Sequence, residues 1–295
     1  MDKLHLQGDT MFIKIKKIKL MIIVIVLLII CTSIGVFKHR QSVLTAATID
    51  GRVAIDNYNK LYVNCYGKGT PTVIFESGLG CTNLDWKIVQ NQISKNTRTF
   101  SYDRAGLGKS DKIRVQRSSL DQVHELHTLL NNANVKGPYI IVAHSIGGYN
   151  ARLFAGTYPN EVAGIVFVDS SHENQLDFLK NSTAQVYNEI SSKSAGAEQT
   201  LDEQIISANQ VKEIRKKDSL RNTPIIVLTA DKNIKPSQDK YEEIMKRMVD
   251  QEKDIASLSN KSKFIFVKDS GHYIQKDKPQ VVIDSIQELI ATVRK

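Results

Sequence analysis

The stretch at residues 139–148, YIIVAHSIGG, constrains the fold more than any other part of this chain. Its first four residues are aromatic or β-branched and show no polar alternation, which is typical of a strand buried on both faces of a parallel sheet. Apolar residues then recur at helical spacing from Tyr149 onward, until Tyr158 and Pro159 end the pattern. A buried strand, a sharp turn at Ser145 and a helix are therefore expected in succession.

The turn in this stretch has the spacing of a nucleophile elbow. Residues 143–147 read AHSIG, which is the pattern G-x-S-x-G with alanine at the first glycine position. A serine on such a strained turn presents its Oγ above the sheet, and the residues two before and two after it must be small. The helix beginning at Ile146 also directs free N–H groups toward negative charge beside Ser145. Ser145 is the candidate nucleophile, although an ordinary glycine-containing turn has the same short pattern.

Strand and helix patterns alternate along the rest of the chain. Strands are expected at residues 52–56, 60–66, 72–75, 98–102, 139–142, 162–168, 223–229 and 262–267, and helices at 120–130, 146–158, 237–258 and 279–293. The first two strands form an antiparallel hairpin. The other strands are nearly continuous in apolar residues, which predicts an α/β fold: a mostly parallel eight-stranded sheet with helices on both faces. Residues 171–222 contain no strand pattern and suit a mostly helical insertion that acts as a lid.

The amino terminus has the pattern of a membrane anchor. Residues 20–37 carry no charge, and a helix of that length spans about 27 Å, close to the thickness of a hydrocarbon core. Five lysines lie within residues 1–19, whereas only Lys38 and Arg40 closely follow the span. The positive-inside rule therefore predicts a basic cytoplasmic tail at 1–19, a single-pass signal anchor at 20–37, a linker at 38–48 and an extracellular domain at 49–295. The alternative is secretion after signal-peptide cleavage near residues 45–47.

Charge and motif content argue against several other classes. Residues 1–40 hold +5 of the formal net charge of +9, so the domain has little excess charge for binding nucleic acid. Residues 103–108, DRAGLG, lack the spacing and lysine of nucleotide-binding loops, so no cofactor is expected. His124 and His127 have no further ligands at metal-site spacing, which argues against a metal site. Cys65 and Cys81 are expected to be free thiols.

Four segments in order carry a resemblance to a known family: ESGLG at 76–80, SYDRAGLGKSD at 101–111, AHSIGG at 143–148 and SGHYIQKDKP at 270–279. Over about residues 49–295 the chain resembles the α/β-hydrolase superfamily, in its serine esterase- and lipase-like branch. The resemblance implies that Ser145 is the nucleophile and His272 the general base, with an oxyanion hole at the backbone N–H groups of Leu79 and Ile146. Ala143 departs from the family pattern, as does the pair Glu76-Ser77, where many members have His-Gly.

The third member of the triad has two candidates. Asp169 ends the sixth expected strand and Asp231 follows the seventh, and both satisfy the order Ser, Asp, His. The position of Asp231 is the commoner one in the superfamily, but Lys232 crowds its turn and no glycine leads it. Asp169 directly ends a buried run, and VDSSHENQ resembles the segment of members that place their acid there. We therefore expect Asp169, with Asp231 as the alternative.

Two other histidines lie near these positions in the sequence. His144 adjoins the nucleophile but leaves the turn in another direction, so we interpret it as structural. His172 could line the pocket, but it lacks the terminal glycine-histidine loop that contains His272.

The residues predict a serine hydrolase that cleaves small-molecule carboxylic esters through a Ser-His-Asp triad and an acyl-enzyme. An acyltransferase, an amidase or peptidase, and a lactonase would use the same triad. The non-enzyme alternative is a hydrolase-like binding module, which would have no physical need for both Ser145 and His272.

Overall fold

The computed structural model of the protein describes residues 48–113, 115–182, 198–231 and 239–295. The predicted tail and anchor and almost all of the predicted linker lie outside the described residues. Within the described ranges, no helix combines the length and the apolar character needed to cross a membrane.

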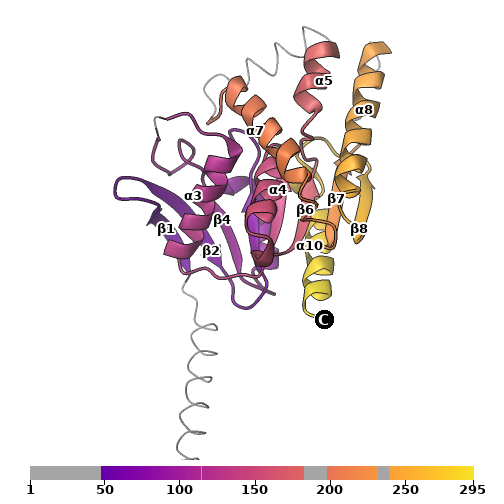
Figure 1. Ribbon diagram of the computed structural model, residues 1–295. Helices are drawn as coiled ribbons and strands as arrows, with labels where there is room; N and C mark the ends of the chain where they lie inside the picture. The colour runs from indigo at the N-terminus through magenta and orange to yellow at the C-terminus, as the bar shows by residue number, and fades with distance from the viewer. Residues whose placement is uncertain (1–47, 114, 183–197, 232–238) are drawn as a thin grey trace, which may run out of the picture. The chain divides into compact units, whose positions relative to one another are not determined.

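One eight-stranded sheet forms the centre of the fold, with the strand order β1-β2-β4-β3-β5-β6-β7-β8 (Figure 1). Strands β1 and β2 pair antiparallel, as do β2 and β4, and all the other neighbours are parallel. The strands are β1 Ile49–Ala54, β2 Lys60–Tyr66, β3 Thr72–Glu76, β4 Thr99–Tyr102, β5 Tyr139–His144, β6 Val162–Val168, β7 Ile225–Ala230 and β8 Ser262–Val267. The predicted mostly parallel eight-stranded sheet is confirmed.

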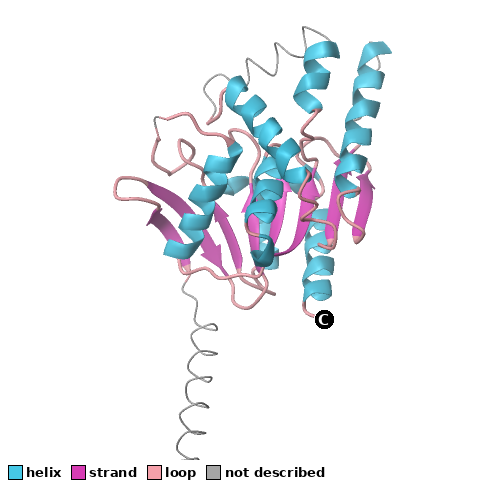
Figure 2. Cartoon of the chain, viewed as in Figure 1, coloured by secondary structure: helices cyan, strands magenta, loops and turns pink. Residues whose placement is uncertain are grey.

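Helices cover both faces of the sheet (Figure 2). The described helices are η1 Asn83–Trp86, α2 Lys87–Ile93, α3 Ser119–Asn132, α4 Gly147–Thr157, η2 Pro159–Glu161, α5 Gln175–Ser182, α7 Leu201–Arg215, α8 Asp239–Ala256, α9 Ile274–Asp277 and α10 Pro279–Val293. Alternate strand residues belong to two separate apolar clusters: Ile141 is in the cluster that includes residues of α3, α4 and α7, and Val142 is in the cluster that includes residues of α2 and α10. This arrangement explains why β5 has no polar alternation, since both of its faces are buried.

The first strand begins and ends earlier than predicted. It spans Ile49–Ala54 rather than residues 52–56, and it pairs with β2 from Ile49 opposite Cys65 to Ala54 opposite Lys60. Asp56 belongs to the turn because its carboxylate accepts the backbone N–H groups of Tyr58 and Asn59, each at 2.7 Å. Aspartate side chains readily accept backbone N–H groups of the next residues and so form turns, which explains why the strand ends before Asp56.

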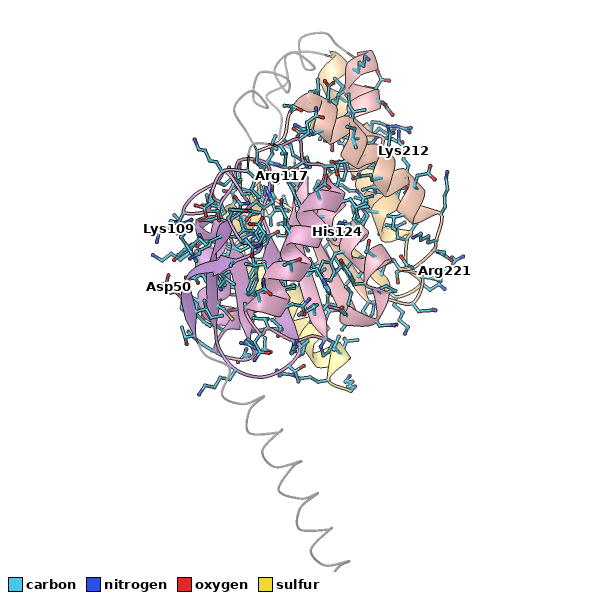
Figure 3. All side chains as sticks on the ribbon, turned by 60° about the vertical axis from the view of Figure 1, so that its left-hand side comes forward. Asp50, Lys109, Arg117, His124, Lys212 and Arg221 are labelled. Carbon is cyan, nitrogen blue, oxygen red and sulfur yellow. The ribbon has the colours of Figure 1, made fainter. Side chains whose placement is uncertain are left out.

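The insertion between β6 and β7 is helical where it is described. Helix α7 begins with a capping box at Thr200 and Glu203, and its Ala208 and Val211 lie in the core beside α4. Lys212 of α7 lies 2.7 Å from Asp177 of α5, and Figure 3 labels it on the outer surface. Residues 183–197 lie outside the described residues, and the function of the insertion as a lid stays a prediction.

Candidate active site

Ser145 lies at the carboxyl end of β5 in a left-handed backbone conformation, with φ of 53°. Non-glycine residues rarely adopt this conformation unless the surrounding structure imposes it. The Ser145 N–H donates to the Val168 carbonyl at 3.3 Å, and its own carbonyl accepts the N–H groups of Gly148 and Ser171 at 3.0 and 2.9 Å. The strained turn expected from the sequence is therefore present, fixed to β6 on one side and to α4 on the other.

Two glycines allow α4 to start this close to the sheet. A Cβ atom at Gly147 would lie 2.8 Å from the backbone oxygens of both Glu76 and Ser77, and a Cβ atom at Gly148 would lie 2.7 Å from Ser170 Cβ. Carbon atoms do not approach that closely without displacing their neighbours. The two glycines after the serine therefore let the start of α4 lie against the ends of β3 and β6.

His272 and Asp169 lie together beside this edge of the sheet. His272 Nδ1 is 2.6 Å from Asp169 Oδ2, although the two residues are 103 positions apart in the sequence. The other carboxylate oxygen, Oδ1, accepts the Ala230 N–H at 2.9 Å. The Asp169 side chain is 1% exposed and that of His272 is 47% exposed. An Nδ1–H that donates to the carboxylate leaves Nε2 as the acceptor nitrogen, the tautomer a general base requires.

Asp169 also adopts a left-handed conformation, with φ of 45°, and its N–H donates to the Leu228 carbonyl at 2.7 Å. Asp231, the alternative acid, accepts the Asp269 N–H at 3.1 Å and donates its own N–H to the Val267 carbonyl at 3.0 Å. Asp231 therefore joins the end of β7 to the loop after β8. Of the two predicted acids, Asp169 has the geometry of an orienting carboxylate.

His144 supports the loop that carries His272. Its Nε2 lies 2.9 Å from the His272 carbonyl oxygen, and the two rings are 4.5 Å apart between centroids. Burial, together with the nearby His272, lowers the pKa of His144 to about 3. The ring is therefore neutral at ordinary pH, with Nε2–H donating to the carbonyl. This geometry fits the structural interpretation of His144.

His172 is engaged elsewhere. Its Nε2 is 2.8 Å from Asp254 Oδ2, and its Nδ1 accepts the Asn174 N–H at 3.0 Å. Burial lowers the pKa of His172, although Glu173 and Asp254 oppose that shift. With both ring nitrogens engaged, His172 has no nitrogen available to act as the rival base.

The turn after β3 lies directly against the nucleophile. A Cβ atom at Gly78 would lie 3.3 Å from Ser145 Cβ and 2.7 Å from His144 Nδ1. Leu79 follows this glycine, and Ile146 is the residue before α4. The hydrogen bonds found among the described residues include none donated by the backbone amides of Leu79 or Ile146. Within the described residues, the backbone N–H groups of Leu79 and Ile146, the two predicted oxyanion donors, therefore have no hydrogen-bond acceptor.

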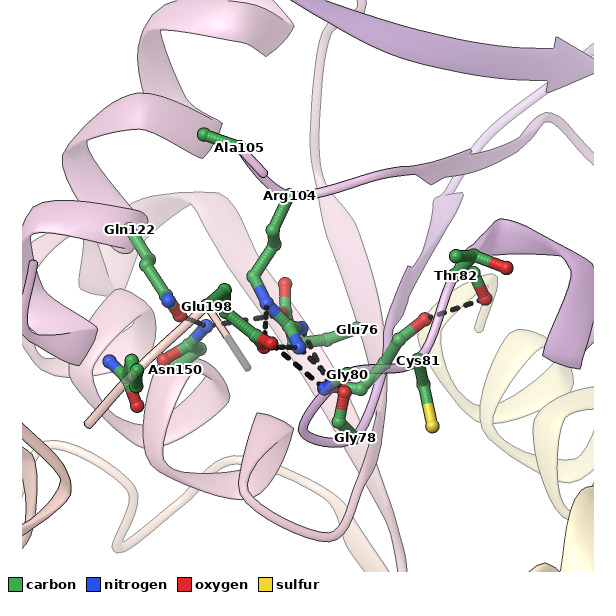
Figure 4. A network of polar contacts seen from close by, with 12 residues as sticks. Glu76, Gly78, Gly80, Cys81, Thr82, Arg104, Ala105, Gln122, Asn150 and Glu198 are labelled. Atoms are coloured by element: carbon green, nitrogen blue, oxygen red, sulfur yellow. Dashed lines mark hydrogen bonds and ion pairs between the residues drawn. The ribbon is translucent and has the colours of Figure 1, made fainter. Parts of the chain in front are cut away.

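Sequence reasoning assigned no role to a buried charged cluster behind this turn. It consists of Glu76, Arg104 and Glu198, all less than 4% exposed in their side chains (Figure 4). Glu76 and Arg104 were visible in the segments ESGLG and SYDRAGLGKSD, but nothing in the sequence connected either of them to Glu198, which lies about a hundred residues further on.

Other candidate ligands do not assemble into a metal site. Across the described ranges, no three His, Cys, Asp or Glu side chains form a group able to hold a metal ion. His127 lies 3.0 Å from Glu161 and stacks on Tyr158. Cys65 and Cys81 are free thiols, and burial together with Asp85 raises the pKa of Cys81 to about 11.

The chain is similar to several known proteins. It is 30% identical over 237 residues to the uncharacterised protein YqjL of Bacillus subtilis, an alignment that covers 80% of this chain and 87% of that protein. Its fold is similar to that of a thermophilic esterase from Thermogutta terrifontis, with a TM-score of 0.58 and 20% identity over 83% of this chain and 98% of that one. Est816, described as an N-acyl homoserine lactone degrading enzyme, gives a TM-score of 0.58 and 15% identity over 80% of this chain and 99% of that one.

The sequence profile of the alpha/beta hydrolase fold matches residues 71–253, a range that includes Ser145 and Asp169. The strand order, the elbow at Ser145 and this match agree, and the chain belongs to the α/β hydrolase family.

Proposed function

We propose that this protein is a serine hydrolase that cleaves carboxylic esters, with Ser145 as nucleophile, His272 as general base and Asp169 as the orienting acid. The observation that carries the proposal is the 2.6 Å contact between His272 Nδ1 and a buried carboxylate that also accepts the Ala230 N–H. An ordinary surface histidine has no need for such a partner. A binding module without catalysis would not need the His272–Asp169 pair together with a serine in a strained turn.

The proposed reaction follows from these positions. His272 Nε2 takes the proton of Ser145 as Oγ attacks the ester carbonyl, and the imidazolium is stabilised by Asp169. The oxyanion of the tetrahedral intermediate accepts the N–H groups of Leu79 and Ile146. His272 then returns the proton to the leaving alcohol, and an acyl group remains on Ser145. Water activated by the same imidazole releases the acid.

Hydrolysis of a panel of esters with graded acyl lengths, with a lactone and an amide included, tests this function. The wild type should hydrolyse at least one short ester, and Ser145→Ala should lose that activity while keeping its circular dichroism spectrum. Ser171→Ala is the matched control, because Ser171 meets the elbow only through its backbone N–H. Equal ester turnover by wild type and Ser145→Ala would refute the proposal. Preferred cleavage of the lactone or amide would keep the triad and change the substrate class.

The localisation proposal rests on the sequence alone. We propose that residues 20–37 anchor the protein in the cell membrane and that the domain at residues 49–295 faces the exterior. The support is the excess of lysines before the apolar segment and its eighteen uncharged residues.

A further inference from the structure

The Arg104 guanidinium binds the backbone of the turn that holds a predicted oxyanion donor. Its Nη2 donates to the Gly78 carbonyl at 2.6 Å and its Nη1 donates to the Ser77 carbonyl at 2.7 Å. The Gly78 carbonyl and the Leu79 N–H belong to the same peptide unit. Figure 4 shows the guanidinium between Gly78, Glu76 and Glu198.

A planar trans peptide fixes the direction of its N–H once its carbonyl is held. The carbonyl oxygen and the amide hydrogen point to opposite sides, so a Gly78 carbonyl directed at Arg104 turns the Leu79 N–H away from Arg104. Gly78 itself lies against Ser145 and His144. A charged donor on the carbonyl also polarises the peptide and strengthens its N–H as a donor.

Two carboxylates hold the guanidinium in this position. Glu76 Oε1 lies 2.7 Å from Nη1, and Glu198 contacts both Nε, at 3.1 Å, and Nη2. Glu198 also accepts the Gly80 N–H at 2.8 Å, so the same carboxylate binds both Arg104 and the turn. Burial would lower the pKa of Arg104, but the charges of Glu198 and Glu76 outweigh burial and raise it. Arg104 is therefore a permanent cation.

Glu76 is fixed in turn by neutral donors. Tyr102 donates its hydroxyl to Oε2 at 2.7 Å, and Asn150 of α4 donates its amide to Oε1 at 3.0 Å. This cluster links the end of β3 and the helix that follows Ser145 to Glu198, which precedes α7. The cluster also binds the backbone of the turn after β3 at three positions, Ser77, Gly78 and Gly80, which an ion pair that only joined two elements would not need.

We propose that Arg104 is a positioning residue for the oxyanion hole, and that Glu198 acts through it. The inference rests on the proposed ester hydrolysis. Arg104 orients and polarises the Gly78–Leu79 peptide, so it stabilises the transition state through the Leu79 N–H without touching the substrate. Substrate binding in the ground state does not depend on it.

The test compares kcat, KM and the inhibition constant of an aryl trifluoromethyl ketone, which forms a charged hemiketal with a serine nucleophile. Arg104→Met should lower kcat and weaken ketone binding by the same factor, roughly 10- to 100-fold, with KM changed by less than about threefold. This loss is smaller than the 10²- to 10³-fold cost of deleting an oxyanion donor, because the Leu79 amide remains. Arg104→Lys, which keeps one cation, should recover part of both losses.

Two further variants make the result decisive. Arg117→Met is the matched control, since Arg117 is also buried and paired with a glutamate, at 2.7 Å, but it donates to the Ala105 carbonyl rather than to the turn. It should change kcat and ketone binding by less than about threefold. The double variant Arg104→Met/Glu198→Gln keeps the net charge of the wild-type cluster, and it should show the same losses as the single variant if Glu198 acts through Arg104.

The outcomes separate this inference from the proposed function. If the wild type neither hydrolyses esters nor binds the ketone, the proposed function fails and the role of Arg104 fails with it. If the wild type is active and a folded Arg104→Met, or the charge-matched double variant, keeps kcat and ketone binding within threefold, only the role of Arg104 is refuted. A rise in KM with kcat unchanged would refute it as well.

Discussion

Replacing Asp169 by asparagine should disable the general base without disturbing the fold. Between the described residues, the Asp169 carboxylate accepts hydrogen bonds from His272 Nδ1 on Oδ2 and from the Ala230 N–H on Oδ1. Asparagine has a single acceptor oxygen. If that oxygen stays on the Ala230 N–H, the amide nitrogen faces Nδ1 and donates to it. His272 then carries its proton on Nε2, which is the nitrogen that must accept the Ser145 proton.

The size of the loss follows from this tautomer change. The wrong tautomer removes proton transfer and leaves substrate binding unchanged, so kcat should fall while KM stays within a few-fold. In the serine protease where the same substitution was made, kcat falls about 10⁴-fold, which corresponds to about 5.5 kcal/mol in the activation free energy. Steady-state hydrolysis of a short aryl ester at pH 7.5 measures kcat, and thermal unfolding checks that the variant keeps the stability of the wild type.

Asp231→Asn is the matched control for this prediction. Asp231 lies at the end of the next strand and accepts the Asp269 N–H, a bond that the asparagine oxygen can keep. Its variant should keep kcat within about threefold of the wild type. The reasoning is refuted if Asp231→Asn loses activity by orders of magnitude while Asp169→Asn retains it.

Three further predictions concern packing, pH and topology. Gly147→Ala should lower the free energy of unfolding by roughly 1–3 kcal/mol, because the added Cβ would lie 2.8 Å from the Glu76 backbone oxygen. Gly51→Ala is the control, since a Cβ there would have open space around it, and it should change that free energy little. Chemical denaturation measures both variants. Burial lowers the pKa of His144 from 6.5 to about 3, so between pH 7.5 and 5.5 the unfolded chain takes up a proton that the folded protein does not. The free energy of unfolding should therefore fall by about 1.4 kcal/mol over this pH range. His144→Asn should remove this contribution to the pH dependence of unfolding. Protease added to intact cells should remove a carboxy-terminal tag if residues 20–37 anchor the domain outside, and a tag cleaved only after lysis would reverse the proposed orientation.

The fold was predictable because its signals are local. Residues 139–142 show no polar alternation since both faces of β5 are buried, and the predicted bounds of β6, β8 and α10 are those of the structure. The start of β1 was missed because a half-buried edge strand shows only a weak pattern, and an aspartate side chain decided where its turn begins.

The candidate site was predictable only in part. Ser145 and His272 stand in short motifs, but the choice between Asp169 and Asp231 depends on which carboxylate reaches Nδ1, and that distance is a property of the folded sheet. Glu198 gave no signal at all, because its contacts with Arg104 and Gly80 join segments about a hundred residues apart. Buried ion pairs of this kind have no sequence period.

The central claim is that Ser145 forms a covalent acyl-enzyme. Mixing the wild type with a slowly deacylated aryl ester or a fluorophosphonate and quenching within seconds should give one added acyl or phosphonyl mass in the intact protein. Peptide mapping should place that mass on the peptide that contains Ser145, and Ser145→Ala should give none. A folded wild type without an adduct, or an adduct that persists in Ser145→Ala, would contradict the account.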